Sequence, residues 1–289
     1  AEAARLYGEA ETSALVYALD NIQPRLARDC VLSLVNLAVV TGNLGKTGAG
    51  IYPMRPGANE QGAWDVGCVP DRLPGYRWVS NPDDRQALET LWDSSIPEIP
   101  GLHLAQIIEA AASGQVKSMF LIGASPNFTN GKLGDGLLAL DNLEFLVVCD
   151  SFLTDAAQRA DVVLPRATFA EKDGTFTNAE RRISRVKKAM EPLAGKADWQ
   201  STLGLAQALG CDWDYESPEQ IMREISALTP TFAGVTYKKI ERLGSIQWPC
   251  WDEESEGTPT MHEESFTHGL GQFIVTEYVP TDERCSRRF

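Results

Sequence analysis

Three short apolar runs that alternate with helical or looped segments are the feature that most constrains the fold of this chain. The runs lie at residues 116–123, 143–150 and 161–165, and an amphipathic helical pattern at residues 103–115 comes before the first. Buried strands that alternate with helices are typical of βαβ units, whose strands run parallel in one sheet. The sequence therefore predicts an α/β fold with a parallel sheet, most clearly within residues 81–165.

A glycine and a carboxylate stand where the first two of these strands end. Ligands of parallel sheets bind at the carboxyl ends of the strands, and here those ends carry Gly123 and Asp150. The N–H groups after Gly123 could face a phosphate, Thr129 could donate a hydrogen bond, and Asp150 could accept one from a ribose or a guanine. The chain has neither a G-x-G-x-x-G nor a P-loop motif. Spacing alone therefore leaves open both a nucleotide-binding edge and an ordinary βα loop with helix caps.

The segment from Lys46 to about Ser80 is rich in Gly, Pro and Asn and is too long for an idle connection, so a functional loop is predicted there. Arg55 is the one cation of residues 52–71. A guanidinium group binds carboxylates through two parallel hydrogen bonds, in a geometry that lysine cannot match. Arg55 is therefore interpreted either as the holder of an anion or as a turn residue paired with Glu60 or Asp65.

Apolar periodicity and turn signals predict the remaining elements. Ser217 is expected to cap the last helix, because serine oxygens accept hydrogen bonds from first-turn N–H groups. From about Pro230 onward the chain is expected to be irregular. The predicted elements are helices over residues 3–10, 25–45, 152–160, 197–210 and 217–228, a strand over 13–20 and a hairpin signal at 173–178.

Net charge excludes one class of partner. The chain carries 26 basic and 40 acidic side chains, which gives a net charge of −14. An acidic surface repels phosphate backbones, so no nucleic acid partner is expected. Any bound anion must be held locally, by a few arginines, by backbone N–H groups or by a helix N-terminus.

Cysteine and histidine positions argue against a metal site formed by this chain alone. The six cysteines form no C-x-x-C pair, so neither zinc nor an iron–sulfur cluster is expected here. Cys149 lies in an apolar run and is predicted to be a small buried hydrophobe. His103, His262 and His268 stand beside no recognisable nucleophile and are expected to be structural or exposed. Scattered cysteines and the lack of any run long enough to span a membrane lead us to expect a cytoplasmic protein.

Two long motifs carry a resemblance to a known family. They are "TGNLGKTGAG…MRPGANEQGAWDVGCVPDRLPGYR" and "LEFLVVCDSFLTDAAQRADVVLPRATFAEKDGTFTNAERR", and the match continues through "KADWQ", "YKKIERLGSIQWPC" and "GTPTMH". Together they resemble a central fragment of the catalytic (alpha) subunit of molybdopterin-dependent formate dehydrogenases, in the dimethyl sulfoxide reductase superfamily. The resemblance covers nearly all 289 residues and implies partial, Rossmann-like parallel-sheet domains of that type.

This resemblance and the element pattern divide the chain into four segments. Residues 1–57 are expected to end a discontinuous α/β domain that carries the active-site loop, and residues 58–165 to form an α/β cofactor-binding domain. Residues 166–228 are expected to be an interdomain segment with helices. Residues 229–289 are expected to be an irregular connector toward a C-terminal barrel. Both ends of the chain look like cuts, so we expect a piece of a larger protein.

The resemblance also implies a chemistry. It implies a bis(molybdopterin guanine dinucleotide) cofactor that carries molybdenum or tungsten and takes two electrons from formate to give CO₂. Arg55 has the position of the family's arginine that faces the metal and holds the formate carboxylate. The resemblance further implies a 4Fe-4S cluster in an N-terminal part, and electron-acceptor subunits of the iron–sulfur or NAD-linked diaphorase kind. The cofactor-binding residues it implies are Gln61, Gly62, Gly123, Ser125, Thr129, Asp150 and Asp198.

Departures from the family pattern keep other interpretations open. The family's glutamine two residues after the arginine is Gly57 here, and Arg166 stands where a small residue is common. The family's metal-ligating cysteine or selenocysteine has no counterpart in the matched motifs, so the 289-residue piece alone is expected to be inactive. The alternatives are another molybdopterin oxidoreductase of the superfamily, and a cofactor-free scaffold like the large iron–sulfur subunit of respiratory complex I.

Overall fold

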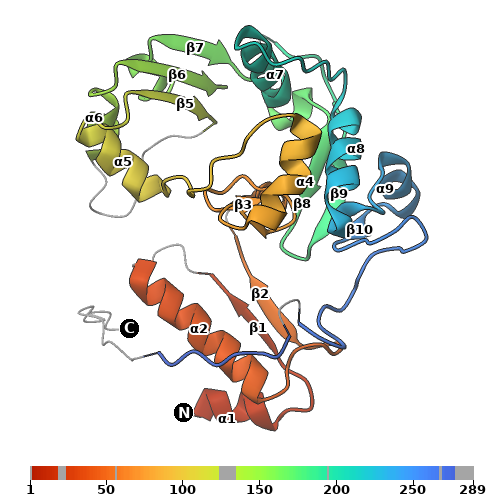
Figure 1. Ribbon diagram of the computed structural model, residues 1–289. Coiled ribbons are helices and arrows are strands. Elements are labelled where there is room, and N and C mark those ends of the chain that lie inside the picture. The colour runs from red at the N-terminus through yellow and green to blue at the C-terminus, as the bar shows by residue number, and fades with distance from the viewer. Residues whose placement is uncertain are drawn as a thin grey trace. The chain divides into compact units, whose positions relative to one another are not determined.

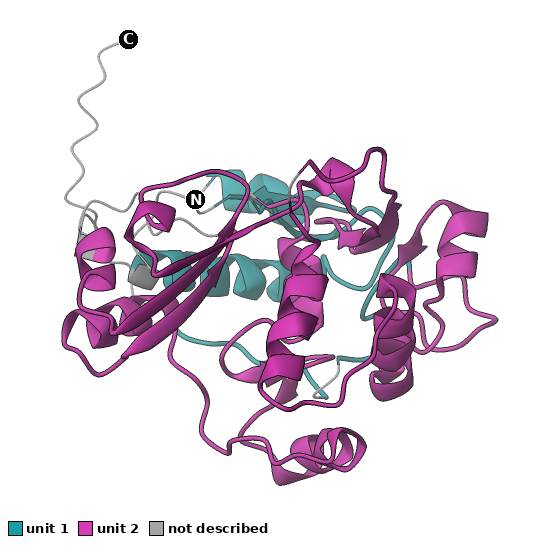
Figure 2. Cartoon of the chain, turned by 90° about the horizontal axis from the view of Figure 1, so that it is seen from above, with its two compact units in different colours: residues 1–56, 259–289 teal, residues 57–258 magenta. Residues whose placement is uncertain are grey.

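The contacts within the chain divide it into two compact units, which Figure 2 shows in teal and magenta. Unit 1 comprises residues 1–56 and 259–289, and unit 2 comprises residues 57–258. The four-segment division expected from the sequence follows the family's domains and stays a prediction. The computed structural model (Figure 1) describes residues 2–18, 24–55, 57–123, 135–193, 195–266 and 269–276.

Unit 1 is built around one pair of parallel strands. Its elements are α1 (Glu2–Glu9), β1 (Ala14–Tyr17), α2 (Pro24–Val40) and β2 (Gly50–Pro53). β1 and β2 pair in parallel along their full length, and α2 lies beside the pair (Figure 1). The Asn36 side chain of α2 donates to the backbone oxygen of Ile274 (2.7 Å) and accepts from its N–H (3.2 Å). These two bonds fix a late segment of the chain against the helix.

The sheet of unit 2 has three parallel strands in the order β5-β6-β7, so the predicted α/β fold with a parallel sheet is confirmed. Its elements are β5 (Ser118–Ile122), β6 (Phe145–Asp150) and β7 (Val162–Pro165), with helices α5 (Leu104–Ala112) and α6 (Asp135–Leu140) packed on it (Figure 1). Leu146 and Val148 of the central strand lie in the core, and Cys149 is fully buried as predicted.

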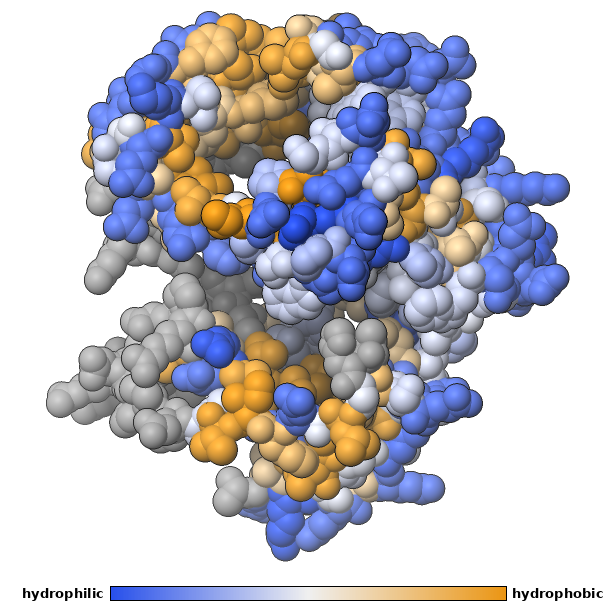
Figure 3. Space-filling view, viewed as in Figure 1, coloured by the Kyte–Doolittle hydropathy of each residue, from blue (hydrophilic) through white to orange (hydrophobic). Residues whose placement is uncertain are grey.

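Part of this sheet stays apolar and exposed. Ile122, Phe145, Val162 and Val163 are between 38% and 47% exposed. Apolar residues gather over the strands of the sheet in the space-filling view (Figure 3). The described part of the chain therefore leaves hydrophobic surface on this sheet open to solvent.

A second layer of unit 2 combines an antiparallel sheet with helical segments around one core. The strands lie in the order β10 (Ile246–Gln247), β9 (Arg182–Val186), β8 (Gly174–Thr177). The helical segments are α8 (Pro218–Leu228), η3 (Pro230–Phe232) and α9 (Tyr237–Leu243). The buried core residues are Ile183, Met222, Phe232, Val235, Tyr237, Ile240, Ile246 and Cys250.

The remaining elements of unit 2 are short, except for two helices of 11 residues. They are α3 (Glu60–Asp65), β3 (Arg72–Leu73), β4 (Arg77–Trp78), α4 (Pro82–Trp92), η1 (Ala157–Arg159), η2 (Phe169–Glu171) and α7 (Asp198–Ala208). The Asn81 side chain caps α4 by accepting a hydrogen bond from the Asp83 N–H (3.0 Å). A proline follows Asn81 and suits the first helical position. Leu88 of α4 is fully buried against Leu73 and Val79.

Most predicted elements are present close to their predicted bounds, and Ser217 caps α8 by accepting from the Gln220 N–H (3.4 Å). Two predictions about elements are wrong. The segment 46–80 is not one continuous loop, because it contains β2, α3, β3 and β4, which are too short to show a sequence period. Residues 152–160 form only the 3-10 turn η1 in place of a helix.

The C-terminal half of unit 2 also departs from expectation. The predicted hairpin exists, but its turn lies between Asn178 and Arg181, and the Asp-Gly pair of the signal lies at the start of β8, with Gly174 as its first residue. The stretch after Pro230 was predicted to be irregular, whereas it forms η3, α9 and β10 and supplies much of the buried core. These elements are two to seven residues long, which is too short to show a sequence period. Their burial against β9, which the sequence does not show, is what orders them.

A buried lysine orders the chain that follows β10. Lys239 is 7% exposed, and its ammonium donates to the backbone oxygens of Asp252 (3.0 Å) and Ser255 (2.8 Å). The Cys250 Sγ lies 3.7 Å from the same nitrogen. A buried ammonium needs acceptors for its three donors, because an unsatisfied buried charge is costly. Lys239 therefore holds an acidic segment through its carbonyl groups.

We expect Lys239→Met to lower the free energy of unfolding by about 2 kcal/mol, because the carbonyl groups of Asp252 and Ser255 lose a charged donor. Urea denaturation followed by tryptophan fluorescence measures the change. Lys238→Met is the matched control, since Lys238 is the exposed neighbour on the same helix. Equal losses in the two variants would contradict this role for Lys239.

Candidate functional site

The carboxyl ends of β5, β6 and β7 bring together residues that are distant in the sequence. Gly123 follows β5, Asp150 ends β6 and Arg166 follows β7. The Gly123 N–H donates to the Cys149 backbone oxygen (2.8 Å), and the Arg166 N–H donates to the Asp150 backbone oxygen (3.0 Å). Because the three strands are parallel, their ends meet at one edge of the sheet, where ligands of such sheets bind. We call Gly123, Asp150, Arg166, Lys172 and Asp198 the carboxyl-edge cluster.

An ion triad forms the centre of the carboxyl-edge cluster. Arg166 donates from Nε to Asp198 Oδ1 (2.6 Å) and from Nη2 to Oδ2 (2.8 Å), and Lys172 Nζ donates to Oδ2 (2.7 Å). Burial opposes ionisation of Asp198, but the hydrogen bonds from Arg166 and Lys172 outweigh it and hold the pKa of that carboxyl below its usual value. The Asp198 hydrogen bond in turn raises the pKa of Arg166. Asp198 and Arg166 are therefore both charged at neutral pH.

Gly123 is needed where the Arg166 guanidinium meets the end of β5. Its φ of +58° lies in the left-handed region, and a Cβ at this position would overlap Arg166 Nη1. Glycine adopts such a conformation without the strain that a side chain brings. The N–H groups after Gly123 were predicted to face a phosphate, which stays a prediction; in this structure the glycine itself lies against the Arg166 guanidinium.

Asp150 retains capacity for a ligand. It is half-buried, its Oδ1 accepts from the Ser151 N–H (2.7 Å), and its Oδ2 lies 3.5 Å from the Thr154 hydroxyl. A carboxylate has about four acceptor positions, so hydrogen bonds remain possible at this edge. Burial raises the pKa of the neighbouring Cys149 thiol, and the Asp198 charge adds to the rise. Cys149 is therefore a protonated core residue rather than a reactive thiolate.

Gln61 and Gly62, two other predicted cofactor-binding residues, lie on α3 and make contacts within the protein. The Gln61 amide donates to Asp65 Oδ1 (2.8 Å) and to the Tyr76 hydroxyl (2.8 Å). The Asn59 side chain accepts from the Thr177 N–H (2.8 Å) of β8. This bond joins the two sequence motifs that carry the family resemblance. A cofactor contact of Gln61 or Gly62 stays a prediction.

Gly62 lies against the Asn59–Thr177 bond, since a Cβ there would overlap Asn59 Oδ1 and come within 3.0 Å of Thr177 Oγ1. We therefore expect Gly62→Ala to destabilise the protein by about 1–3 kcal/mol, because overpacking displaces this bond. Gly204→Ala is the matched control, since Gly204 lies in α7 with open space around it. It should stabilise by about 0.5–1 kcal/mol. Thermal denaturation of both variants checks the opposite signs, and a Gly62→Ala protein as stable as wild type would contradict the packing.

Arg55, the predicted catalytic residue, lies in unit 1, two residues after the end of β2. It is half-buried, and β2 ends beside β1, where the Met54 N–H donates to the Tyr17 backbone oxygen (2.7 Å). Burial raises the pKa of the Tyr17 phenol, and the Arg55 charge opposes that rise. Arg55 thus also stands at the carboxyl end of a parallel strand pair. Ser125 and Thr129, the remaining predicted cofactor-binding residues, lie outside the described residues.

Sequence reasoning missed Lys172 and treated Arg166 only as a departure from a pattern. Arg166 follows the third apolar run directly, so its position at the carboxyl edge could have been read from the same strand rule that selected Gly123 and Asp150. Lys172 belongs to a charged turn after η2, and only the fold brings its amine to Asp198.

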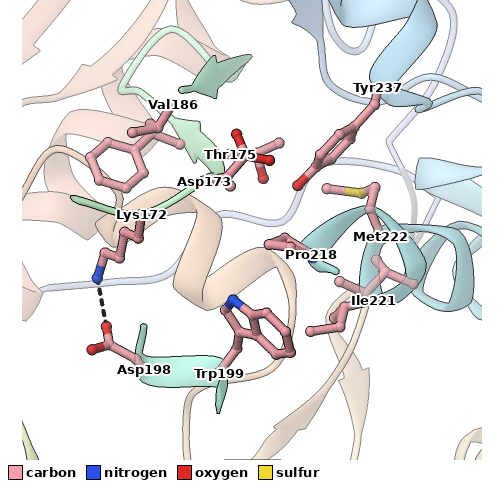
Figure 4. A pocket seen from close by; sticks show the side chains of 13 residues that line it. Lys172, Asp173, Thr175, Val186, Asp198, Trp199, Pro218, Ile221, Met222 and Tyr237 are labelled. Atoms are coloured by element: carbon pink, nitrogen blue, oxygen red, sulfur yellow. Dashed lines mark hydrogen bonds and ion pairs between the residues drawn. The ribbon is translucent and has the colours of Figure 1, made fainter. Parts of the chain in front are cut away.

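A cavity of about 250 Å³ lies beside the cluster, with Lys172 and Asp198 in its wall (Figure 4). Trp199, Met222 and Tyr237 line it from α7, α8 and α9. The Tyr237 hydroxyl points into the cavity in Figure 4. The Arg185 guanidinium covers the face of the Tyr237 ring at 3.8 Å. The cavity is therefore mainly apolar and carries charge at one end.

Burial raises the pKa of Tyr237 to about 12, compared with about 10 in an unfolded chain. The stability that follows from this shift is present below about pH 10 and is lost as pH rises toward about 12. We expect Tyr237→Phe to reduce this alkaline loss of unfolding free energy. Urea denaturation of both proteins at neutral pH and near pH 11–12 measures the difference. An unchanged alkaline loss would show that Tyr237 does not cause it.

Within the described ranges, no group of three or more His, Cys, Asp or Glu side chains is placed to hold a metal ion. Of the helices in the same ranges, none is both long and apolar enough to cross a bilayer.

Comparison with known proteins decides the family. The family profile described as molybdopterin oxidoreductase matches residues 9–207. The chain belongs to the molybdopterin oxidoreductase family. The family predicted from the sequence motifs is thus confirmed, and with it a molybdenum–pterin cofactor. The donors and acceptors of the carboxyl-edge cluster suit a polar, anionic ligand, because Asp150 keeps acceptor positions and Arg166 and Lys172 supply charged donors.

Several relatives in this family carry names of their own. "F420-dependent formate dehydrogenase 2 subunit alpha" of Methanococcus maripaludis is 41% identical over 290 residues, which are 98% of this chain and 42% of the relative. "Formate dehydrogenase H" of Escherichia coli is 37% identical over 289 residues, 98% of this chain and 40% of the relative. "Probable oxidoreductase YjgC" of Bacillus subtilis is 40% identical over 273 residues, which are 94% of this chain and 28% of the relative. The chain therefore spans less than half the length of these relatives.

Acetylene hydratase from Pelobacter acetylenicus matches 71% of this chain and 26% of its own, with 17% sequence identity and a TM-score of 0.44.

Proposed function

We propose that this chain is the central part of a formate dehydrogenase catalytic subunit, which oxidises formate to CO₂ with transfer of two electrons. The observation that carries the proposal is its similarity, at 37–41% identity over 98% of the chain, to proteins named formate dehydrogenase. Arg55 and the "EKDGTFTNAERR" segment stand at the matching positions of the motifs. The chain's place within a longer protein makes the activity one of the whole protein.

The cofactor proposed for the whole protein is bis(molybdopterin guanine dinucleotide) with molybdenum or tungsten. When bound, it would supply the two-electron acceptor for formate. The carboxyl-edge cluster would hold one guanine dinucleotide: Asp150 would accept hydrogen bonds from the guanine or ribose, and the backbone after Gly123 would approach the nucleotide. Gln61, Gly62, Ser125, Thr129 and Asp198 remain proposed contacts on the strength of the resemblance.

Arg55 is proposed as the residue that orients formate. A guanidinium fork can donate two parallel hydrogen bonds to a carboxylate and fix its plane. Its charge would also offset the negative charge of the substrate as the C–H bond breaks. Its place after β2 supports this role, because backbone pairing with β1 limits the motion of the residue that carries the fork.

Further parts of the proposed enzyme lie in its other segments and partners. We propose a 4Fe-4S cluster in the whole protein and electron transfer to iron–sulfur or NAD-linked diaphorase subunits, in a cytoplasmic enzyme. These proposals rest on the resemblance alone.

Formate-dependent dye reduction by the full-length protein, with metal and pterin analysis of the same sample, tests the function. We expect Arg55→Ala to lower kcat/KM for formate roughly 10²–10³-fold, because a charged donor to the reacting carboxylate is lost. Arg55→Lys should recover only part of this loss, because lysine keeps the charge and lacks the fork. Pterin and metal contents should stay at wild-type levels in both variants.

Arg28→Ala is the matched control, an exposed arginine of the same unit, and should turn over formate normally. The 289-residue chain alone is expected to reduce no dye. Full-length protein with neither metal nor pterin would point to a cofactor-free scaffold. Full-length protein that contains metal and pterin but does not oxidise formate would point to another oxidoreductase of the family. Normal formate turnover by Arg55→Ala would contradict the role proposed for Arg55.

A further inference from the structure

Positive charge collects at the carboxyl edge of a strongly acidic chain. Arg166 and Lys172 belong to the carboxyl-edge cluster, and Lys196 pairs with Arg166 through an isolated β-bridge. The carboxylates of Asp150 and Asp198 accompany the charges of Arg166 and Lys172, in a protein whose net charge is −14. An anion that approaches this protein is repelled by its net negative charge and meets charged hydrogen-bond donors at this edge.

The Arg166 guanidinium is held rigidly with one edge available. Its Nε and Nη2 form the two parallel bonds to Asp198. Nη1 lies against Gly123, and within the described part of the chain it bonds to no protein acceptor. The side chain is 28% exposed, so Nη1 is not sealed from solvent. A fork fixed in this way binds an oxygen acceptor without first losing its own side-chain entropy.

The adjoining groups select the kind of acceptor. Asp198 already accepts three hydrogen bonds, from Arg166 twice and from Lys172 once, which leaves it little capacity for a ligand donor. Asp150 keeps that capacity at the end of the next strand. The edge therefore offers a carboxylate suited to N–H groups and a cationic donor suited to oxyanions.

We propose that Arg166 is a phosphate-binding residue of this chain, which donates from Nη1 to a phosphate oxygen of a guanine nucleotide at the carboxyl edge. Asp198 positions the Arg166 guanidinium through the two hydrogen bonds that it accepts from it. This inference rests on the proposed function, since the nucleotide is the one that the proposed cofactor carries. It assigns a ligand contact to a position where the family motif has a small residue.

The test is binding of GDP, inorganic diphosphate and guanosine to the 289-residue protein, measured by calorimetry at low ionic strength. We expect GDP and diphosphate to compete for one site. Arg166→Met should weaken the binding of GDP and of diphosphate roughly 10- to 100-fold, as expected for loss of a charged hydrogen bond. Guanosine binding should change less than threefold. Asp198→Asn should weaken GDP binding by a smaller factor. The Arg166 guanidinium then loses the carboxylate that holds it in place, but it keeps its own charge.

Arg159→Met is the matched control, because Arg159 lies in the same unit and pairs with the exposed Asp141 at 3.1 Å, away from the cluster. Arg166→Lys is a second variant that can keep an ion pair with Asp198 and is therefore less prone to unfold. Thermal denaturation shows whether each variant is folded. A folded Arg166→Lys or Arg166→Met that binds diphosphate like wild type would overturn the proposal. So would equal losses for guanosine and GDP, or no GDP binding by the wild type. Formate takes no part in these measurements, so failure of the proposed activity is seen separately in dye reduction.

Discussion

Parallel pairing of β5, β6 and β7 is the constraint on which the rest of the candidate site depends. It places the residues after all three strands at one edge, although 43 positions of sequence separate Gly123 from Arg166. Once the strands are in register, the backbone amides of Gly123 and Arg166 are bonded to carbonyl groups of β6. The ion triad can then form with little further loss of chain freedom, because its arginine is already positioned. Rigid placement, rather than the number of ion pairs, is what makes such a cluster suited to a ligand.

The same pairing explains why part of the structure could be predicted from the sequence. Apolar runs that end in Gly123 and Asp150 are a local signal of two strands. Because parallel strands end at the same edge of a sheet, this signal also predicts that the two residues lie close together. The start of α4 was not predicted, although Asn81 followed by proline is a local signal of a helix start. Phe232, Ile240 and Ile246 gave no such signal. Their elements are short, and they are ordered only because they share one core with Ile183 of a distant hairpin.

Side-chain partners were predicted less well than strands. Gln61 and Asp198, two of the predicted cofactor-binding residues, have protein partners in the structure, and their cofactor contacts stay predictions. Such contacts depend on residues far away in the sequence, as when Lys172 reaches Asp198, and no local pattern reports them. The resemblance identified the family because it rested on long motifs, whereas individual roles need the geometry of each position.

The hydrogen bond between the Asn59 side chain and the Thr177 N–H spans 118 positions of sequence. Closing so long a segment costs chain entropy, and it is recovered only when β8 and β9 have already paired. The position of Asn59 therefore depends on the β8–β9 hairpin as well as on its own neighbours in sequence. A surface formed by both motifs is complete only when the two distant segments have met.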